Sequence, residues 1–470
     1  MISTRNPRTG AIDGSVDETS HQQLTNEVAR VREAQRRWSA RPAAARAEVL
    51  AALKGQLEAH RDKMIGALVA DTGRTRESAM EFDATIGALD RWCRLGPQIL
   101  ADEPRFTSAV GFIDIARNHR PYEVVGIISP WNFPLVLSTI DLLPALMAGC
   151  GVVLKPSEVT PRFAAPLQAS IDAVPELADL VRVVIGDGSL GAAMIALVDA
   201  ICFTGSVPTG RTVAVLAAEE FIPAFLELGG KDPAIVVAGA DLDLATSALL
   251  WGSTSNAGQA CQSIERIYVQ RSVHDEFVEM LVAKAARVGL CWPDPDSPGL
   301  GPIISERQVA VIEAHLSDAI FKGASVRCGS SSVEYHGGGA WVRPTVLTDV
   351  DHSMMIMTEE TFGPFLPVMG FDCVDDAVAL ANDSRFGLSA AVFASTNDEA
   401  ESIAARVDAG AVSVNDSTLT AFVWEGEKHS FKSSGLGGSR MGPASLLRFL
   451  RSQAFLVKTN TAPDPWWYPE

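Results

Sequence analysis

Residues 200–210, AICFTGSVPTG, decide the fold that we expect for this chain. The first half, Ala200–Thr204, is a short apolar run typical of a buried strand, and a helix is predicted over about 209–219. Between them, Gly205 allows close backbone approach, and Ser206 offers a hydroxyl beside N–H groups that favour an anion. The stretch therefore predicts a phosphate-binding turn, with a turn that binds nothing as the alternative.

The same rhythm of strand, loop and helix continues on both sides of this unit. Alternating short apolar strands and helices favour βαβ units and a parallel, doubly wound sheet. Amphipathic helices are predicted over about 21–100, and a long loop rich in Gly and Ser over 425–443. Strands are predicted at 124–128, 151–154, 181–185 and 235–237, and a second α/β series over about 264–414.

Residues 108–128 show a different pattern. Two extended apolar runs flank the polar residues 117–121, which predicts a β-hairpin that leads into a buried strand.

The composition excludes several classes of protein. Hydrophobic residues make up 47% of the 470 residues and charged residues 20%, which predicts a globular chain. A formal net charge of -18 argues against nucleic acid and anionic membranes as partners. The seven cysteines lack C-x-x-C spacing, so neither a disulfide framework nor a metal site is expected, and the cytoplasm is favoured. No signal peptide or membrane-spanning run is recognised.

Two further loops are candidates for binding a nucleotide. Residues 186–191 match G-x-G-x-x-G, but no acid follows at the required distance, so we interpret them as a strand-to-helix turn. Residues 154–158, LKPSE, end another strand, and ligands of open parallel sheets bind at the carboxyl ends of strands. A Lys and a Glu there suit ribose hydroxyls, and a solvated loop is an equally good interpretation.

Three residues have the chemistry of an acyl-transfer site. Cys261 lies among small residues in 256–262, NAGQACQ, which leaves a thiol reachable, although a lone cysteine is more often a buried apolar residue. Asn132, in the rigid stretch 129–134, suits an oxyanion donor. Glu227, beside two glycines, suits a general base once it is desolvated. Taken alone, Asn132 and Glu227 are more often structural.

Together these motifs resemble the hydrolytic, NAD(P)-dependent members of the aldehyde dehydrogenase superfamily. The similarity runs from Asn6 to about residue 455, and its motifs occur in the order and spacing of that family. They are Pro130–Pro134, Lys155–Glu158, Phe203–Ser206, Glu227–Lys231, Gly258–Cys261 and Glu359–Pro364.

The resemblance implies an α/β fold with a Rossmann-type cofactor domain, an α/β catalytic domain and a small β oligomerisation flap. We expect the cofactor domain at 1–107 and 126–229, the catalytic domain at 230–445, the flap at 108–125 and 446–458, and a C-terminal tail at 459–470. A homodimer or homotetramer is implied as well. The aromatic tail, Trp466–Tyr468, either covers a neighbouring subunit or packs on its own.

The resemblance also implies the chemistry. Cys261 attacks an aldehyde, Asn132 and the Cys261 backbone N–H hold the oxyanion, and Glu227 activates the water that hydrolyses the thioester. A free ribose 2′-hydroxyl at Glu158 favours NAD over NADP. The residues implied in cofactor binding are Ile128, Trp131, Lys155, Ser157, Glu158, Gly205, Ser206, Gly210, Leu228, Glu360 and Phe362.

The chain departs from the family at a charged pair. Many relatives carry a Lys where this chain has Asp141, and a Glu in a Gly-Arg-Glu run where this chain has 434–442, SGLGGSRMG. We expect Ile140, Thr418 and Thr420 at the substrate mouth, where no Arg stands out to bind a substrate carboxylate. The expected substrate is therefore a small-to-medium, largely apolar aliphatic or aromatic aldehyde.

Two other functions are considered. A CoA-acylating relative needs no general base at position 227, so Glu227 argues against it. A structural protein that kept only the fold would have lost a catalytic residue, and all three are present.

Overall fold

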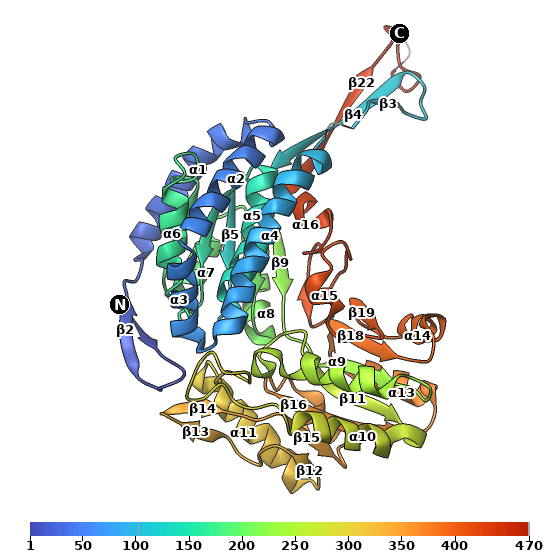
Figure 1. Cartoon of the computed structure of the whole chain (residues 1–470). Helices are drawn as coiled ribbons and strands as arrows, with labels where there is room; N and C mark the ends of the chain where they lie inside the picture. Colours follow the sequence, from blue (N-terminus) through green and yellow to red (C-terminus); the bar gives the residue numbers. More distant parts are fainter. Residues whose placement is uncertain (102, 469–470) are drawn as a thin grey trace.

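The computed structural model describes residues 1–101 and 103–468, so the last two residues of the expected tail lie outside it. Two α/β units lie one above the other, and a narrow β arm projects from the first (Figure 1). None of the helices in these residues is long and apolar enough to cross a membrane.

The first unit contains the sheet predicted from residues 200–210. Five of its six strands are parallel, and their mostly buried residues form the near-continuous apolar runs of a sheet covered on both faces. The sheet order is β21 (Gly435–Leu436), β9 (Ala224–Glu227), β8 (Ala200–Thr204), β5 (Val124–Ile128), β6 (Gly151–Lys155), β7 (Val181–Val183).

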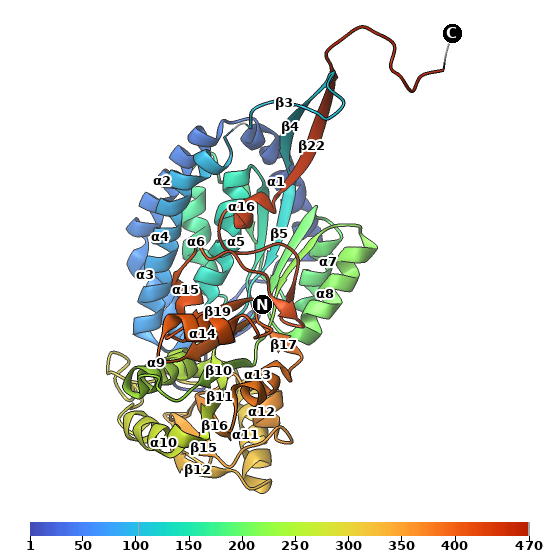
Figure 2. The same cartoon turned by 90° about the vertical axis from the view of Figure 1, so that its right-hand side faces the viewer.

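Helices cover both faces of this sheet, as Figure 2 shows. One face carries α2 (Ala43–Ala59), α3 (Arg61–Thr72), α4 (Thr75–Ile99), α5 (Pro134–Ala148) and α6 (Ala164–Asp172). The other carries α1 (His21–Ser39), α7 (Gly188–Ile195) and α8 (Val207–Glu219). Helix α8 begins two residues earlier than predicted because Ser206 caps it, and Asp187 caps α7, which confirms that 186–191 is a strand-to-helix turn.

The second unit is a seven-stranded sheet, parallel except where β12 pairs with β15. Its order is β12 (Ser325–Cys328), β15 (Thr345–Thr348), β16 (Phe365–Phe371), β11 (Ile264–Gln270), β10 (Asp232–Val236), β18 (Ser389–Phe393), β19 (Ala411–Val414). Its helices are α9 (Leu242–Thr254), α10 (Arg271–Ala285), α11 (Glu306–Phe321), α12 (Met355–Thr358), α13 (Val374–Asn382), α14 (Asn397–Ala404) and α15 (Leu419–Phe422). The chain then returns to the first unit, where α16 (Ala444–Leu447) packs on α5. Three small strand pairs complete the description: β1 (Ile2–Arg5) with β2 (Ile12–Val16), β13 (Glu334–His336) with β14 (Gly339–Trp341), and β17 (Phe386–Gly387) with β20 (Phe431–Lys432).

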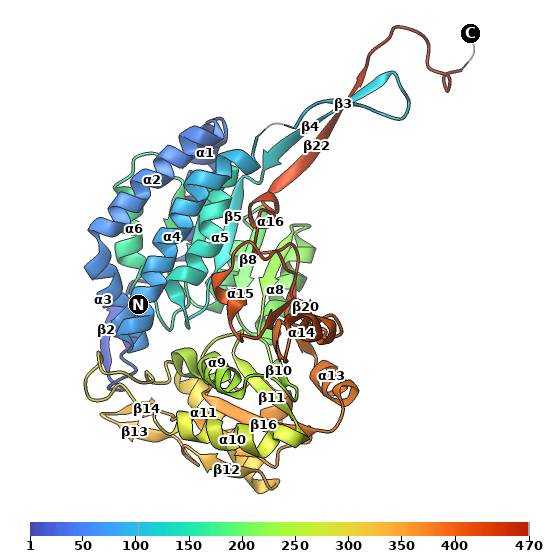
Figure 3. The same cartoon turned by 45° about the vertical axis from the view of Figure 1, so that its right-hand side comes forward.

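The arm corrects the predicted hairpin. Residues 117–121 form no turn; they belong to β4 (Ile113–Pro121), which pairs along its length with β22 (Leu450–Lys458) and briefly with β3 (Phe106–Thr107). The prediction was wrong because the arm projects into solvent (Figure 3), where polar side chains are compatible with a strand. Its partner strand lies more than 300 positions further along the chain, where no local pattern could reveal it.

The tail after β22 packs in part on its own arm. The ring of Trp466 stacks on Phe112 at 5.9 Å, and the ammonium of Lys458 lies 4.4 Å from the Trp467 ring centroid. The Tyr468 side chain is fully exposed.

Candidate active site

The carboxyl edge of the first sheet faces the amino edge of the second. Glu227 ends β9, and only Leu228–Lys231 separates it from Asp232, where β10 begins. Two glycines make this crossing possible: a Cβ at Gly229 would lie 2.2 Å from the Glu360 carboxylate, and one at Gly230 would lie 2.5 Å from the Cys261 carbonyl oxygen. The chain is therefore drawn tightly past the cysteine.

A cavity of about 200 Å³ lies at this junction. It brings together the three predicted catalytic residues and six of the predicted cofactor residues. Its lining consists of Pro130, Trp131, Asn132, Leu137, Thr204, Gly205, Ser206, Glu227, Leu228, Gly229, Cys261, Gln308, Val311, Glu360 and Phe362.

Cys261 follows a strained turn and precedes β11. Asn256 and Ala257, in the 3₁₀ segment Ser255–Gly258, both have φ of 54°, a left-handed conformation that is unfavourable for non-glycine residues. Hydrogen bonds hold the turn: the Asn256 amide donates to the Gln259 carbonyl at 3.0 Å, and the Gln259 amide donates back to the Asn256 carbonyl at 2.9 Å. The turn thus presents the thiol to the cavity with its backbone fixed.

The thiol of Cys261 is half-buried and protonated at neutral pH. Burial raises its pKa to about 11. The carboxyl groups of Glu360, Asp232 and Glu227 add to this increase, whereas the ammonium of Lys428 opposes it. A thiol has to lose its proton before it can act as a nucleophile, and Glu227 lines the same cavity.

Asn132 is held from three directions. Its side-chain amide donates to the Gln259 carbonyl at 3.0 Å, which leaves its second amide hydrogen for the cavity. Its own carbonyl accepts from Arg74 Nη2 at 2.6 Å and from the Asn256 amide at 3.1 Å. Among the described residues the Cys261 backbone N–H has no protein acceptor. The two donors that an oxyanion needs are therefore both free.

A buried ion pair supports the Asn132 loop from behind. Arg74 pairs with Glu81 at 3.3 Å, and both side chains are almost fully buried. Glu81 also accepts hydrogen bonds from the backbone N–H groups of Leu135 and Val136, in the first turn of α5. One carboxylate thereby satisfies the helix start while its arginine fixes Asn132.

Glu227 ends β9 of the first sheet and lines the same cavity as the thiol. Its carboxylate accepts a hydrogen bond from Ser430 Oγ at 2.9 Å. Its backbone is fixed by β8 on one side, where it aligns with Thr204, and by β21 on the other, where it aligns with Gly435. The side chain is half-buried, so part of it remains accessible to water.

A second buried ion pair supports the loop with Glu360 and Phe362. Lys231 pairs with Glu265 at 2.6 Å, and the Glu265 carboxylate accepts from the N–H groups of Thr361 and Phe362. This support offsets the positive φ of 52° at Phe362, whose ring meets Trp131 edge-on at 5.4 Å. Burial raises the pKa of Glu360 to about 8, with a further increase from Glu265.

The remaining predicted cofactor residues follow the sheet edge outside the cavity. Ile128 and Lys155 end neighbouring strands in register. Lys155 pairs with Glu158 at 3.8 Å. Ser157 accepts from the Val159 N–H, and Gly210, in α8, packs closely against Leu228. The strand order reverses between β5 and β8, so this edge is the switch point at which open α/β sheets bind nucleotides.

Several residues around the cavity were missed by sequence reasoning. Ser430 and Gln308 reach the site from a loop and from α11, and no local pattern marks either. Thr204 could have been recognised, because it lies immediately before Gly205 at the end of a strand. Asp141 was noted as a departure, but its partners were not predicted: it is buried and contacts both Arg440 and Arg448. Position 141 therefore takes part in a charged cluster of one acid, on α5, and two arginines.

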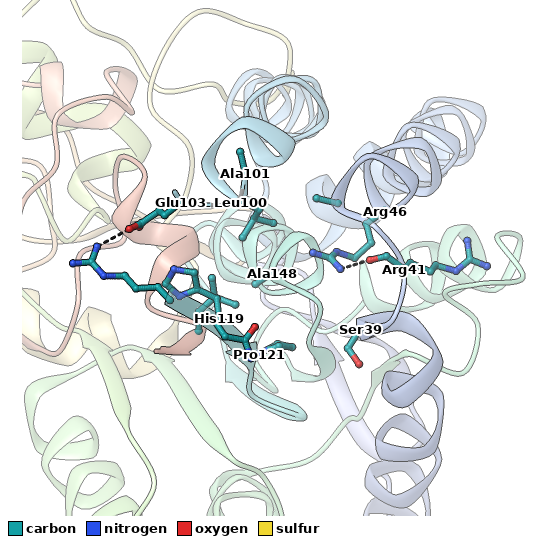
Figure 4. Close-up of a pocket in the computed structure, with 13 residues that line it drawn as sticks. Ser39, Arg41, Arg46, Leu100, Ala101, Glu103, His119, Pro121 and Ala148 are labelled. Carbon is teal, nitrogen blue, oxygen red and sulfur yellow. Dashed lines mark hydrogen bonds and ion pairs between the residues drawn. The ribbon is translucent and has the colours of Figure 1, made fainter. Parts of the chain in front are cut away.

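A second cavity, of about 220 Å³, lies at the base of the arm (Figure 4). Two of its arginines have partners within the lining: Arg117 Nη1 lies 2.6 Å from Glu103 Oε2, and Arg46 Nη1 donates to the Arg41 carbonyl at 2.6 Å. The Cys261 thiol and the carboxyl groups of Glu227 and Glu360 line the other cavity, which is therefore the candidate active site.

Comparison with known proteins gives a consistent result. Residues 1–455 match the group described as the Aldehyde dehydrogenase family. A putative succinate-semialdehyde dehydrogenase of Mycolicibacterium smegmatis, NADP(+)-dependent by its name, is 37% identical over 441 residues, which cover 93% of this chain and 85% of that protein.

Solved structures agree with this match. The structure of the putative aldehyde dehydrogenase PutA from Anabaena variabilis has a TM-score of 0.98 and 52% identity, with 100% of both chains covered. Betaine aldehyde dehydrogenase from Staphylococcus aureus, in complex with NAD+, has a TM-score of 0.92 and 29% identity, with 99% of this chain and 93% of that chain covered.

The raised thiol pKa leads to a measurable prediction. Iodoacetamide should alkylate Cys261 in the cofactor-free protein about tenfold faster for each pH unit between about 7 and 9.5, because only the thiolate reacts. Lys428→Met should slow the reaction at every pH in this range, whereas Lys322→Met, which removes a distant lysine paired with Asp318, should not. Peptide mass spectrometry measures the rate. A Cys261 rate that is constant with pH would contradict the prediction.

Proposed function

The chain belongs to the aldehyde dehydrogenase family, and we propose that Cys261, Glu227 and Asn132 carry out its reaction in the cavity between the two α/β units. It is an NAD(P)-dependent oxidoreductase that converts an aldehyde to a carboxylic acid. The observation that carries the assignment is the meeting of the thiol, the carboxylate and the amide in one cavity, although they come from distant parts of the chain.

The geometry supports a covalent mechanism. The Cys261 thiolate adds to the aldehyde carbon, and the Asn132 amide and the Cys261 backbone N–H hold the negative oxygen. The nicotinamide cofactor, when bound, accepts the hydride. Glu227 then removes a proton from the water that hydrolyses the thioester. Because Glu227 lines the cavity beside the thiol, hydrolysis is favoured over transfer of the acyl group to CoA.

The cavity lining supports a largely apolar substrate. Leu137 and Val311 supply aliphatic surface, and Trp131 and Phe362 supply aromatic surface. The described lining contains neither Lys nor Arg, so a substrate carboxylate would find no cationic side chain there to bind it. We therefore infer a small-to-medium aliphatic or aromatic aldehyde, in preference to an anionic one such as the substrate named for the M. smegmatis relative.

Cofactor binding is assigned to the sheet edge described above. Lys155 and Glu158 fit the adenosine ribose, the capped start of α8 fits the pyrophosphate, and Glu360 with Phe362 fits the nicotinamide side. Glu158 favours a free 2′-hydroxyl over a 2′-phosphate, so we propose NAD as the preferred cofactor.

The arm is assigned to self-association. Strand β22 forms the edge of the three-stranded sheet, and its nine residues include exposed Phe455 and Leu456. A long apolar edge strand is an unstable feature of a monomer unless something pairs with it. We propose a homodimer or homotetramer in the cytoplasm, formed through the regions 108–125 and 446–458, with 1–107 and 126–229 as the cofactor domain and 230–445 as the catalytic domain.

Two substitutions separate the steps of the mechanism. Cys261→Ser should abolish NADH formation from propanal and NAD. Glu227→Gln should retain one turnover of NADH but lower the steady-state rate at least about 100-fold, because the thioester forms and is then not hydrolysed. Stopped-flow absorbance at 340 nm measures both, with the exposed Glu219→Gln as the control. Undiminished turnover in Cys261→Ser would exclude the mechanism.

Cofactor preference is tested at Glu158. The unmodified enzyme should have at least about tenfold higher kcat/KM for NAD than for NADP, and Glu158→Gln should reduce that ratio by about tenfold, because a like charge near the 2′-phosphate is removed. Steady-state kinetics with both cofactors measure the ratio. An enzyme that prefers NADP before substitution would refute the assignment.

The arm assignment is tested by mass in solution. Light scattering should give a multiple of the 50.0 kDa chain. The double variant Phe455→Lys, Leu456→Lys should have the mass of a single chain, because charged side chains on β22 prevent a second strand from pairing with it. Truncation after Pro463 should leave it unchanged, because Trp466 already packs on Phe112 of the same arm. A monomeric mass for the unmodified protein would disprove the proposal. A lower oligomeric mass after truncation would show that the tail contacts a neighbouring subunit.

A further inference from the structure

A buried cluster of charges contacts Thr204, the residue that aligns with Glu227 on the neighbouring strand. Asp141, in the middle of α5, is 1% exposed and accepts from Arg440 Nε at 3.2 Å and from Arg440 Nη2 at 2.7 Å. Arg448 donates to the same carboxylate. Burial by itself would raise the pKa of Asp141, but the two guanidinium groups hold that pKa below its usual value. The cluster therefore contains one anion and two cations, and one positive charge remains uncompensated within it.

The remaining charge is directed towards the active site. Burial by itself would lower the pKa of Arg440, but the carboxylates of Asp141 and Glu227 raise it. Arg440 is thus a cation close enough to Glu227 for the two charges to influence each other. The other charged groups around the thiol are Asp232, Glu360 and Lys428, which belong to the second unit or to the loop over it.

One hydroxyl connects Arg440 to the cavity. The Nη2 group of Arg440 donates to Thr204 Oγ1, and Thr204 lines the cavity at the position aligned with Glu227 on the neighbouring strand. Because one lone pair of Thr204 is occupied by the guanidinium, the hydroxyl hydrogen is free to be donated into the cavity. Asp141, through Arg440, therefore sets the direction of a donor beside the general base.

We propose that Arg440 is a positioning residue for the hydrolytic half of the reaction. It keeps the Glu227 carboxylate and the Thr204 hydroxyl in the arrangement that holds the attacking water. In that step the water oxygen bonds to the thioester carbonyl carbon, its proton passes to Glu227, and the carbon–sulfur bond breaks to release the Cys261 thiolate. The inference rests on the function proposed above, and Asp141 and Arg448 serve only to hold Arg440.

The test compares the first turnover with later ones. With propanal and NAD, Arg440→Met should form NADH in the first turnover within about twofold of the unmodified rate, and should then show a steady-state rate about 10- to 100-fold lower, because a misplaced water slows only hydrolysis. Arg440→Lys should recover part of that rate. Thr204→Val should resemble Arg440→Met, whereas Thr204→Ser should remain close to the unmodified enzyme.

The possible outcomes are distinct. An unchanged steady-state rate in Arg440→Met, or an equal loss in both phases, would overturn the inference, since an equal loss shows a merely structural role. If Arg440→Met does not fold, Thr204→Val and Thr204→Ser decide the matter alone: a slow second phase only in the valine variant supports the inference, and its absence overturns it. Failure of the proposed function would look different, as NADH formation by Cys261→Ser.

Discussion

The active site depends on a set of amide hydrogen bonds between the two α/β units. Asn132, on the first unit, donates to the Gln259 carbonyl, and Asn256 of the second unit donates to the Asn132 carbonyl. The Asn256 amide also donates to the Gln259 carbonyl, and the Gln259 amide donates back, which holds the left-handed backbone at Asn256 and Ala257 that precedes Cys261. Strain of this kind persists only where the surroundings over-determine it. The proposed oxyanion donor and the proposed nucleophile are therefore positioned by one network.

Buried ion pairs reinforce both loops that enter the cavity. Arg74–Glu81 supports the Asn132 loop, and Lys231–Glu265 supports the Glu360 loop through backbone N–H groups. Burying two charges costs about as much as their attraction returns, so such pairs contribute little net stability. Their value here is geometric: each gives several hydrogen bonds of fixed direction to a loop that regular secondary structure does not hold. The cluster of Asp141, Arg440 and Arg448 is a third buried group of charges, and it donates a hydrogen bond to Thr204 at the edge of the cavity.

Local pattern predicted most of the fold and failed at the arm. The run at 200–210 predicted a strand, a tight turn and a helix, and the structure has them at Ala200–Thr204 and Val207–Glu219. Residues 117–121 looked like a turn because polar residues usually interrupt strands, yet they continue β4. That strand is specified by pairing with β22, which is a long-range contact. Ser430 and Gln308 were missed for the same reason: each approaches the cavity only through tertiary packing.

The sequence by itself determined the family, the α/β units and the residues proposed for the reaction. Each of these can be recognised from short motifs that follow one another in a fixed order along the chain. It also showed that position 141 carries an acid. Only the tertiary structure decided what that acid does. Residues 299 and 307 positions later in the chain bring two guanidinium groups to it, and one of them reaches Thr204 beside Glu227. Such a cluster cannot be predicted from sequence, because a buried charge needs a partner and only the folded structure shows which distant residue supplies it.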